Sequence, residues 1–85
     1  MEKLYWFSTK QHAHDVEFRC NRVYNNICGM ENKGKKVPDS MYRLHDDLEA
    51  ILCYMAGSCD RPVQLPGRLY AIARDSVAWA NSVRG

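Results

Sequence analysis

The clearest pattern in the chain is a stripe of apolar residues in its middle part. The apolar positions recur at alternating steps of three and four residues, at Met41, Leu44, Leu48, Ile51 and Met55. This spacing places their side chains on one face of an α-helix. Pro38 can open the first turn, and Gly57 can close the last turn in a left-handed cap. The pattern therefore predicts a helix over 39–56 with one face that the rest of the chain must cover.

The same spacing appears closer to the N-terminus. The apolar residues of this second stripe are Ala13, Val16, Cys20, Val23, Ile27 and Met30. Ser8 is a typical N-cap residue, and Gln11 stands three positions later, where it completes a capping box. Phe7 precedes the cap and is placed to pack against the residue at position 12. With Gly29 as the terminator, these features predict a helix over 9–29.

A third stripe lies near the C-terminus and predicts a helix over 68–83. Its members are Leu69, Ile72, Ala73, Val77, Trp79, Ala80 and Val83. The segment 57–67 has helix breakers at both ends, so we expect a long connection there and a candidate functional loop. The large apolar residues 4–7 are too few for a helix, and no partner strand is evident. Residues 1–8 are therefore expected to form an arm or short strand that plugs one end of the core.

Three amphipathic segments joined by two connections predict an all-α fold, a small three-helix bundle with a short N-terminal arm. The simplest arrangement of such helices is up-down-up within a single domain over 1–85. A chain of this size buries roughly 60–65% of its unfolded surface, which leaves little stability in excess. Association into a homodimer is therefore an open expectation.

Composition narrows the classes of function. The formal net charge is +2 and the pI is about 8.4, which is too mild for a dedicated nucleic-acid or membrane-surface protein. No window approaches the roughly 20 apolar residues of a membrane span, and the opening apolar run is too short for a secretory signal. We therefore expect a cytoplasmic protein whose cysteines are reduced.

His12 and His14, followed by Asp15, form the most conspicuous candidate metal site. Residues two apart point in nearly opposite directions on a helix, whereas they would share a face on a strand. The capping box favours the helix, so we predict no metal and no cofactor. The cysteines also lack the C-x-x-C pair of a zinc module. A small metal-binding protein is the third hypothesis for function.

The middle predicted helix carries a charged outer side at His45, Asp46, Asp47 and Glu49. Paired carboxylates can transfer protons or hold a cation, but charged groups on the exposed arc of an amphipathic helix are usually only solvated. Cys20 lies within an apolar stripe, where a thiol serves as a small core residue. No nucleophile can be matched with a base, so we predict that the protein is not an enzyme.

Several aromatic residues fall outside the predicted stripes. Phe18 projects nearly opposite the first stripe, beside Arg22, and has no predicted core to join. Tyr42 lies outside the middle stripe, and Tyr70 and Arg74 border the alanines at the back of the third helix. Aromatic and arginine side chains on polar surfaces are enriched at protein interfaces. We therefore predict these five residues as partner-binding residues.

These observations favour a non-catalytic protein-binding module or regulator that docks on another protein or on itself. Short chains with a complete core and no catalytic site are frequent among phage and mobile-element accessory proteins that inhibit or redirect host machinery, and we expect a protein of that kind. The alternative is a nucleic-acid-associated regulator that contacts phosphates through Lys33, Lys35, Lys36 and Arg68. The length of the 57–67 connection excludes a sequence-reading helix-turn-helix.

Overall fold

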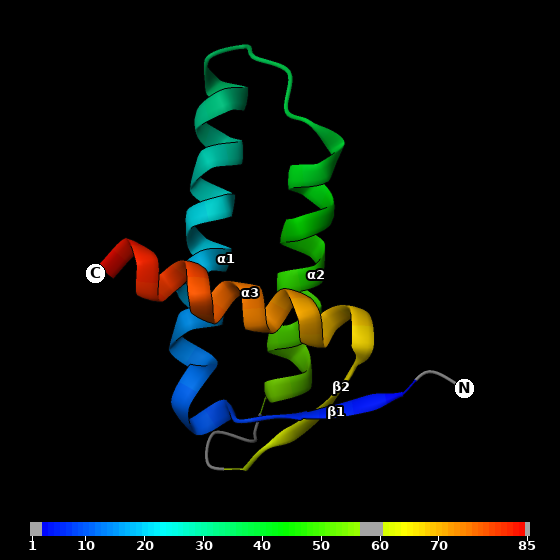
Figure 1. The fold of residues 1–85 in the computed structure, drawn as a ribbon. Helices are drawn as coiled ribbons and strands as arrows, with labels where there is room; N and C mark the ends of the chain where they lie inside the picture. The colour runs from blue at the N-terminus through cyan, green and yellow to red at the C-terminus, as the bar shows by residue number, and fades with distance from the viewer. Residues whose placement is uncertain (1–2, 57–60, 85) are drawn as a thin grey trace.

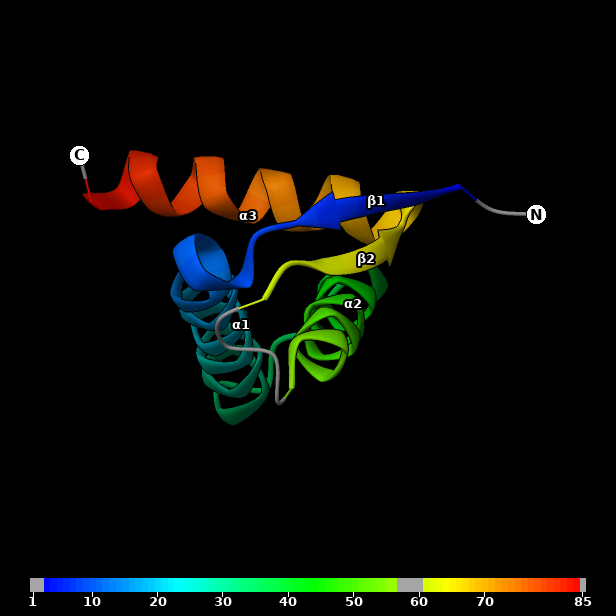
Figure 2. The same cartoon turned by 90° about the horizontal axis from the view of Figure 1, so that it is seen from below.

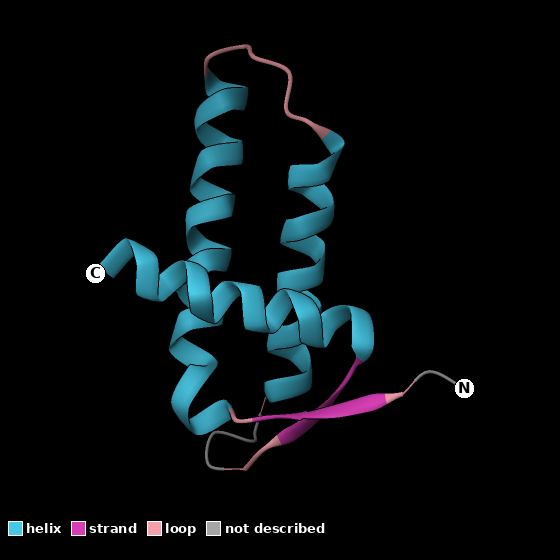
Figure 3. Ribbon diagram, in the orientation of Figure 1, coloured by secondary structure: helices cyan, strands magenta, loops and turns pink. Residues whose placement is uncertain are grey.

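The computed structural model describes residues 3–56 and 61–84. Within them lie helices α1 (Thr9–Asn32), α2 (Asp39–Met55) and α3 (Gly67–Arg84) and strands β1 (Leu4–Phe7) and β2 (Val63–Pro66), shown in Figures 1 and 3. Of the described residues, 75% are helical, which confirms the predicted three-helix fold with an N-terminal arm. None of the described helices is long and apolar enough to cross a membrane.

α1 and α2 form an antiparallel hairpin, and α3 crosses one side of that hairpin (Figures 1 and 2). α3 contacts both helices, but it does not continue the up-down-up arrangement that is simplest for three helices. The reason lies in the segment before it. β2 leads directly from Pro66 into Gly67 at the start of α3, so the direction of α3 follows from the sheet and not from a free loop.

The two strands form a small antiparallel sheet at the open end of the hairpin. Leu4 lies opposite Pro66 and Phe7 lies opposite Val63. The expected arm is thus a strand with a partner, and the last part of the 57–67 connection is that partner and not a loop. Strands of four residues are too short to show a clear alternation of apolar and polar side chains, and a proline argues against a strand. The pairing could therefore not be predicted from the sequence.

The core lies where the three helices and the sheet meet. Val16, Leu48, Ile51 and Leu65 are fully buried, and the predicted stripes of all three helices supply most of the other core residues. A leucine from β2 therefore sits at the centre of a core that the sequence assigned to helices alone.

The ends of the helices differ in part from the prediction. α1 continues through Gly29 to Asn32, and the left-handed turn falls at Gly34, whose φ is 72°. Ser8 occupies the N-cap position, but its side chain makes no capping hydrogen bond. Phe7 packs against the residue at position 12 as expected, with ring centroids 5.5 Å apart. The predicted cap at Gly57 lies outside the described residues.

Candidate functional site

The sheet has one buried face and one open face. Side chains alternate between the two faces of a strand, and residues opposite each other on paired strands share a face. Phe7 and Leu65 are buried on the face toward the helices, whereas Leu4 is 49% exposed and Trp6 is 64% exposed on the other. Trp6 is therefore a large apolar side chain with no place in the core.

Aromatic rings connect the buried face of β1 to α3. The ring of Tyr5 stacks on the ring of Tyr70 with a centroid distance of 4.9 Å and an interplanar angle of 18°. Phe7 meets the same ring edge-on at 6.4 Å. Offset stacks and edge-on contacts of this kind add to the effect of burial. These contacts fix β1 beside the first turns of α3.

A groove runs between β1 and α3. Its volume is about 410 Å³, and its wall on the N-terminal side is formed by Trp6, Phe7, Ser8 and His12. The opposite wall is a stripe of α3 residues at helical spacing, consisting of Tyr70, Arg74, Val77, Ala78 and Asn81. We call this feature the β1–α3 groove. It combines aromatic and aliphatic side chains with polar groups that could orient a ligand.

The β1–α3 groove is positively biased. Arg74 holds its guanidinium 5.8 Å from the centre of the Tyr70 ring, and none of the described residues that line the groove carries a carboxylate. Among residues 3–56 and 61–84, no ion pair involves Arg74. Just outside the groove, the Lys3 ammonium lies 5.4 Å from the centre of the Tyr5 ring. An acidic group entering the groove would thus meet a cation whose charge is not already neutralised.

The backbone edge of β1 that faces away from β2 borders the same groove. β2 lies between β1 and the hairpin helices (Figure 2), so the other edge of β1 is turned away from the hairpin. The described residues contain no further strand beside it. An open strand edge is a template for another extended chain.

Phe18 is not an outward residue without neighbours. Its ring packs against Trp79 of α3, with centroids 5.1 Å apart, and the guanidinium groups of Arg22 and Arg84 lie 5.7 Å and 5.4 Å from its ring centre. Phe18 lies outside the hydrophobic core cluster, as expected, but it is not isolated, because it packs on α3. A projection of one helix cannot show that α3 crosses α1 on this side.

The five predicted partner-binding residues fall in three places. Tyr70 and Arg74 lie together in the β1–α3 groove, and Phe18 and Arg22 lie together where α1 meets α3. Tyr42 stands apart on α2, where its hydroxyl donates a hydrogen bond to a Glu31 carboxylate at 3.2 Å. Partial desolvation and the charge of Glu31 raise the pKa of Tyr42.

Trp6 and His12 are groove residues that the sequence did not indicate. For Trp6, the sequence offered only the run of apolar residues at 4–7, whose spacing is not helical. Trp6 becomes exposed because these residues form a strand, and that strand pairs with residues far away in the chain. His12 is half-buried, and its Nδ1 atom has no hydrogen-bond partner within the described parts of the chain. That atom lies 3.7 Å from a carboxylate oxygen of Asp15.

The four residues of the nucleic-acid alternative do not share one surface. Lys33, Lys35 and Lys36 are exposed in the loop at the end of the hairpin farthest from the sheet (Figure 1). Arg68 lies in the first turn of α3, next to the sheet, and donates to the Asp47 carboxylate at 2.7 Å. Any phosphate contact by the loop would therefore proceed without Arg68.

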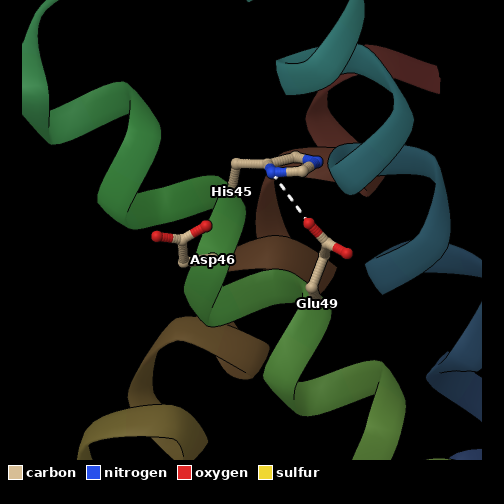
Figure 4. Close-up of side chains that lie close together, drawn as sticks. All are labelled: His45, Asp46 and Glu49. Carbon is tan, nitrogen blue, oxygen red and sulfur yellow. Dashed lines mark ion pairs between the residues drawn. The ribbon is translucent and has the colours of Figure 1, made fainter.

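A possible cation cluster lies on α2 rather than at the histidines near the N-terminus. His45, Asp46 and Glu49 bring potential ligand atoms within 4.8 Å of one another, and His45 Nδ1 lies 3.0 Å from a Glu49 oxygen (Figure 4). Both carboxylates are exposed, as is usual for a solvated helix face. His12 and His14 do lie on a helix, which removes the strand geometry that their metal site required.

The thiol of Cys20 is not activated for nucleophilic attack. Cys20 is buried, and burial raises the pKa of its thiol, with the charges of Glu49 and Glu17 adding to the effect. A raised pKa disfavours the thiolate, which is the nucleophilic form. Cys53 is exposed on α2. Cys20 therefore serves as a core residue, as the sequence indicated.

Comparisons with protein-family models, with curated proteins and with solved structures found no match.

Proposed function

We propose that this chain is a non-catalytic cytoplasmic protein-binding module that docks on another protein through the β1–α3 groove. The observation that carries the proposal is the exposure of Trp6, at 64%, on the rim of a groove that also holds Arg74, which makes no ion pair among residues 3–56 and 61–84. Tryptophan and arginine are the side chains most enriched among interface residues that contribute strongly to binding.

The composition of the groove supports docking of a protein rather than catalysis. Five of its nine lining residues are aromatic or aliphatic, and the other four are an arginine, a serine, a histidine and an asparagine. Aromatic side chains contribute a large contact area and have few rotatable bonds to immobilise. A module of this kind acts by occupying a surface of its target, which is how a small accessory protein would inhibit or redirect a larger complex.

A capture experiment with matched variants tests the proposal. The tagged chain is incubated with lysate of its native cell, and bound proteins are identified by mass spectrometry. We expect the Trp6→Ala variant to lose a partner that the wild-type chain retains. Tyr54→Ala is the control, because Tyr54 is an exposed aromatic on α2 at 49%. Equal capture by wild type and Trp6→Ala would remove the groove from the docking surface.

A second candidate function is contact with nucleic-acid phosphates through the loop lysines. It is favoured by the absence of any ion pair to Lys33, Lys35 or Lys36 within residues 3–56 and 61–84. Binding through phosphates weakens steeply with salt. Fluorescence-anisotropy titration with a labelled duplex at low and moderate salt would therefore distinguish it, and affinity that is unchanged by Lys35→Glu would exclude it.

A further inference from the structure

We infer that the ligand of the β1–α3 groove is an extended peptide segment bearing a carboxylate side chain, which adds to the free edge of β1 as a third strand. This inference rests on the proposed function and specifies the chemistry of the partner. Three features of the groove carry it: the open edge of β1, the length of the wall formed by α3, and the distribution of charge.

The open edge of β1 requires a strand as its neighbour. Backbone N–H and C=O groups along the edge of a sheet point sideways, where only another extended chain can pair with them in series. β1 has one partner strand among the described residues, and that partner is β2. Addition of a strand to such an edge is a common mode of peptide recognition.

The opposite wall has the length and direction that suit a short strand. β1 and α3 run side by side in the same direction (Figures 1 and 2). From Tyr70 to Asn81, α3 rises about 16 Å along its axis, and β1 extends about 10 Å from Leu4 to Phe7. A docked segment of similar length would place every second side chain against Tyr70, Val77 and Ala78, and would cover the ring of Trp6.

The charge of the groove selects an acidic segment. Arg74 is exposed on the α3 wall and makes no ion pair among residues 3–56 and 61–84. Within the described parts of the chain, the lining includes no carboxylate that would repel an incoming one. A carboxylate that reaches the guanidinium gains charge-assisted hydrogen bonds, which are stronger than neutral ones. A lysine or arginine at the same position of the segment would be repelled.

Selection from a peptide library provides the ligand for the test. Random linear peptides displayed on phage are selected on the immobilised full chain, and the enriched sequences are synthesised. We expect enrichment of peptides that carry Asp or Glu among β-branched and aromatic residues, without proline in the paired stretch. Enrichment of amphipathic helical sequences, or of none, would overturn the inference.

Backbone methylation of the enriched peptide tests strand addition directly. Replacing each peptide N–H in turn by N–CH₃ removes one donor, and only alternate donors of a strand face its neighbour. We expect binding to fall at every second position and to persist at the positions between. Amide hydrogen exchange of the protein should slow at alternate residues of β1 when the peptide is added. Uniform sensitivity along the peptide would contradict an added strand.

Charge reversal tests the role of Arg74. Arg74→Glu should weaken binding of the acidic peptide by about tenfold or more, and exchanging the acidic residue of the peptide for lysine should restore it. Arg43→Glu is the matched control, because Arg43 is exposed on α2 away from the groove lining. An equal loss of peptide affinity in the two variants would show that only the net charge of the protein matters. That result would overturn the assignment of a carboxylate to Arg74.

Two outcomes separate this inference from the proposed function. If Trp6→Ala abolishes capture of a cellular protein while the methylation scan shows no alternation, the groove docks a partner but not as a strand. If sedimentation of the protein alone reveals a dimer that Trp6→Ala dissociates, a second copy occupies the groove and the peptide assignment fails.

Discussion

Two clusters on α3 are built from the same kinds of side chain, aromatic rings beside arginines. In the C-terminal half, Phe18 of α1 packs on Trp79 and is flanked by Arg84. In the N-terminal half, Tyr70 packs on β1 and is flanked by Arg74. We call them the closed cluster and the open cluster.

The two clusters differ in what neutralises the arginine and in what covers the rings. Arg84 donates to the buried carboxylate of Asp15 at 2.5 Å, which ties α3 to α1. Arg74 has no such carboxylate among the described residues, and the neighbouring Trp6 remains exposed. The closed cluster is thus part of the fold, whereas the open cluster is a surface with unused binding capacity. Residue type alone does not separate structural from docking aromatics.

The largest effect is expected from truncating the closed cluster. Phe18→Ala removes a half-buried ring from the contact between α1 and α3 and should lower the free energy of unfolding by about 2 kcal/mol. The midpoint of thermal unfolding should fall by roughly 10 °C. Circular dichroism during heating measures both. Tyr54→Ala serves as the control. An unchanged unfolding midpoint in Phe18→Ala would show that the Phe18 ring does not stabilise the fold.

A smaller loss is expected from the ion pair that closes this cluster. Asp15→Asn keeps the shape of the side chain but removes its charge, and should cost about 1 kcal/mol because Arg84 is largely solvated. Urea unfolding of Asp15→Asn, Arg84→Gln and the double variant forms a cycle that isolates the coupling. Strictly additive losses would mean that the pair contributes nothing of its own.

In the open cluster, we expect one substitution to abolish binding of a partner without lowering the stability of the fold. Trp6→Ala should change the free energy of unfolding by less than about 0.5 kcal/mol, because the ring is mostly exposed. The same variant should lose the captured partner. Chemical denaturation and capture are measured on one preparation. A variant that unfolds as readily as Phe18→Ala would show that Trp6 belongs to the fold and not to the docking surface.

The smallest effect concerns pH and reports how well the core around Cys20 excludes water. Burial raises the pKa of Cys20, so the folded state holds this proton more tightly than the unfolded state. The contribution is fully present below the unfolded pKa of about 8.5 and declines as pH rises above it. Urea unfolding between pH 7 and pH 9.5 should show this decline in wild type and a shallower one in Cys20→Ala. Identical slopes would mean that the thiol is accessible.

Local patterns in the sequence determined the helices. Steps of three and four residues at Val16, Leu48 and Ile51 assign a buried face to each helix without reference to any other part of the chain, and these residues are fully buried. The start of α1 could also be predicted, because Phe7 and its contact at position 12 lie only five positions apart in the chain. Gly29 misled, since a glycine lowers helix stability by only about 1 kcal/mol and the flanking turns outweigh it.

Only the tertiary structure decided where α3 lies and which aromatic residues stay exposed. The pairing of Leu4 with Pro66 joins residues that are far apart in the chain. A strand of four residues is too short for its alternation of apolar and polar residues to be recognised in the sequence. That pairing turns α3 across the hairpin, covers Phe18 and leaves Trp6 outside. Helical spacing is a property of neighbours along the chain, whereas exposure depends on what the rest of the molecule brings alongside, so the groove arises only when the chain is folded.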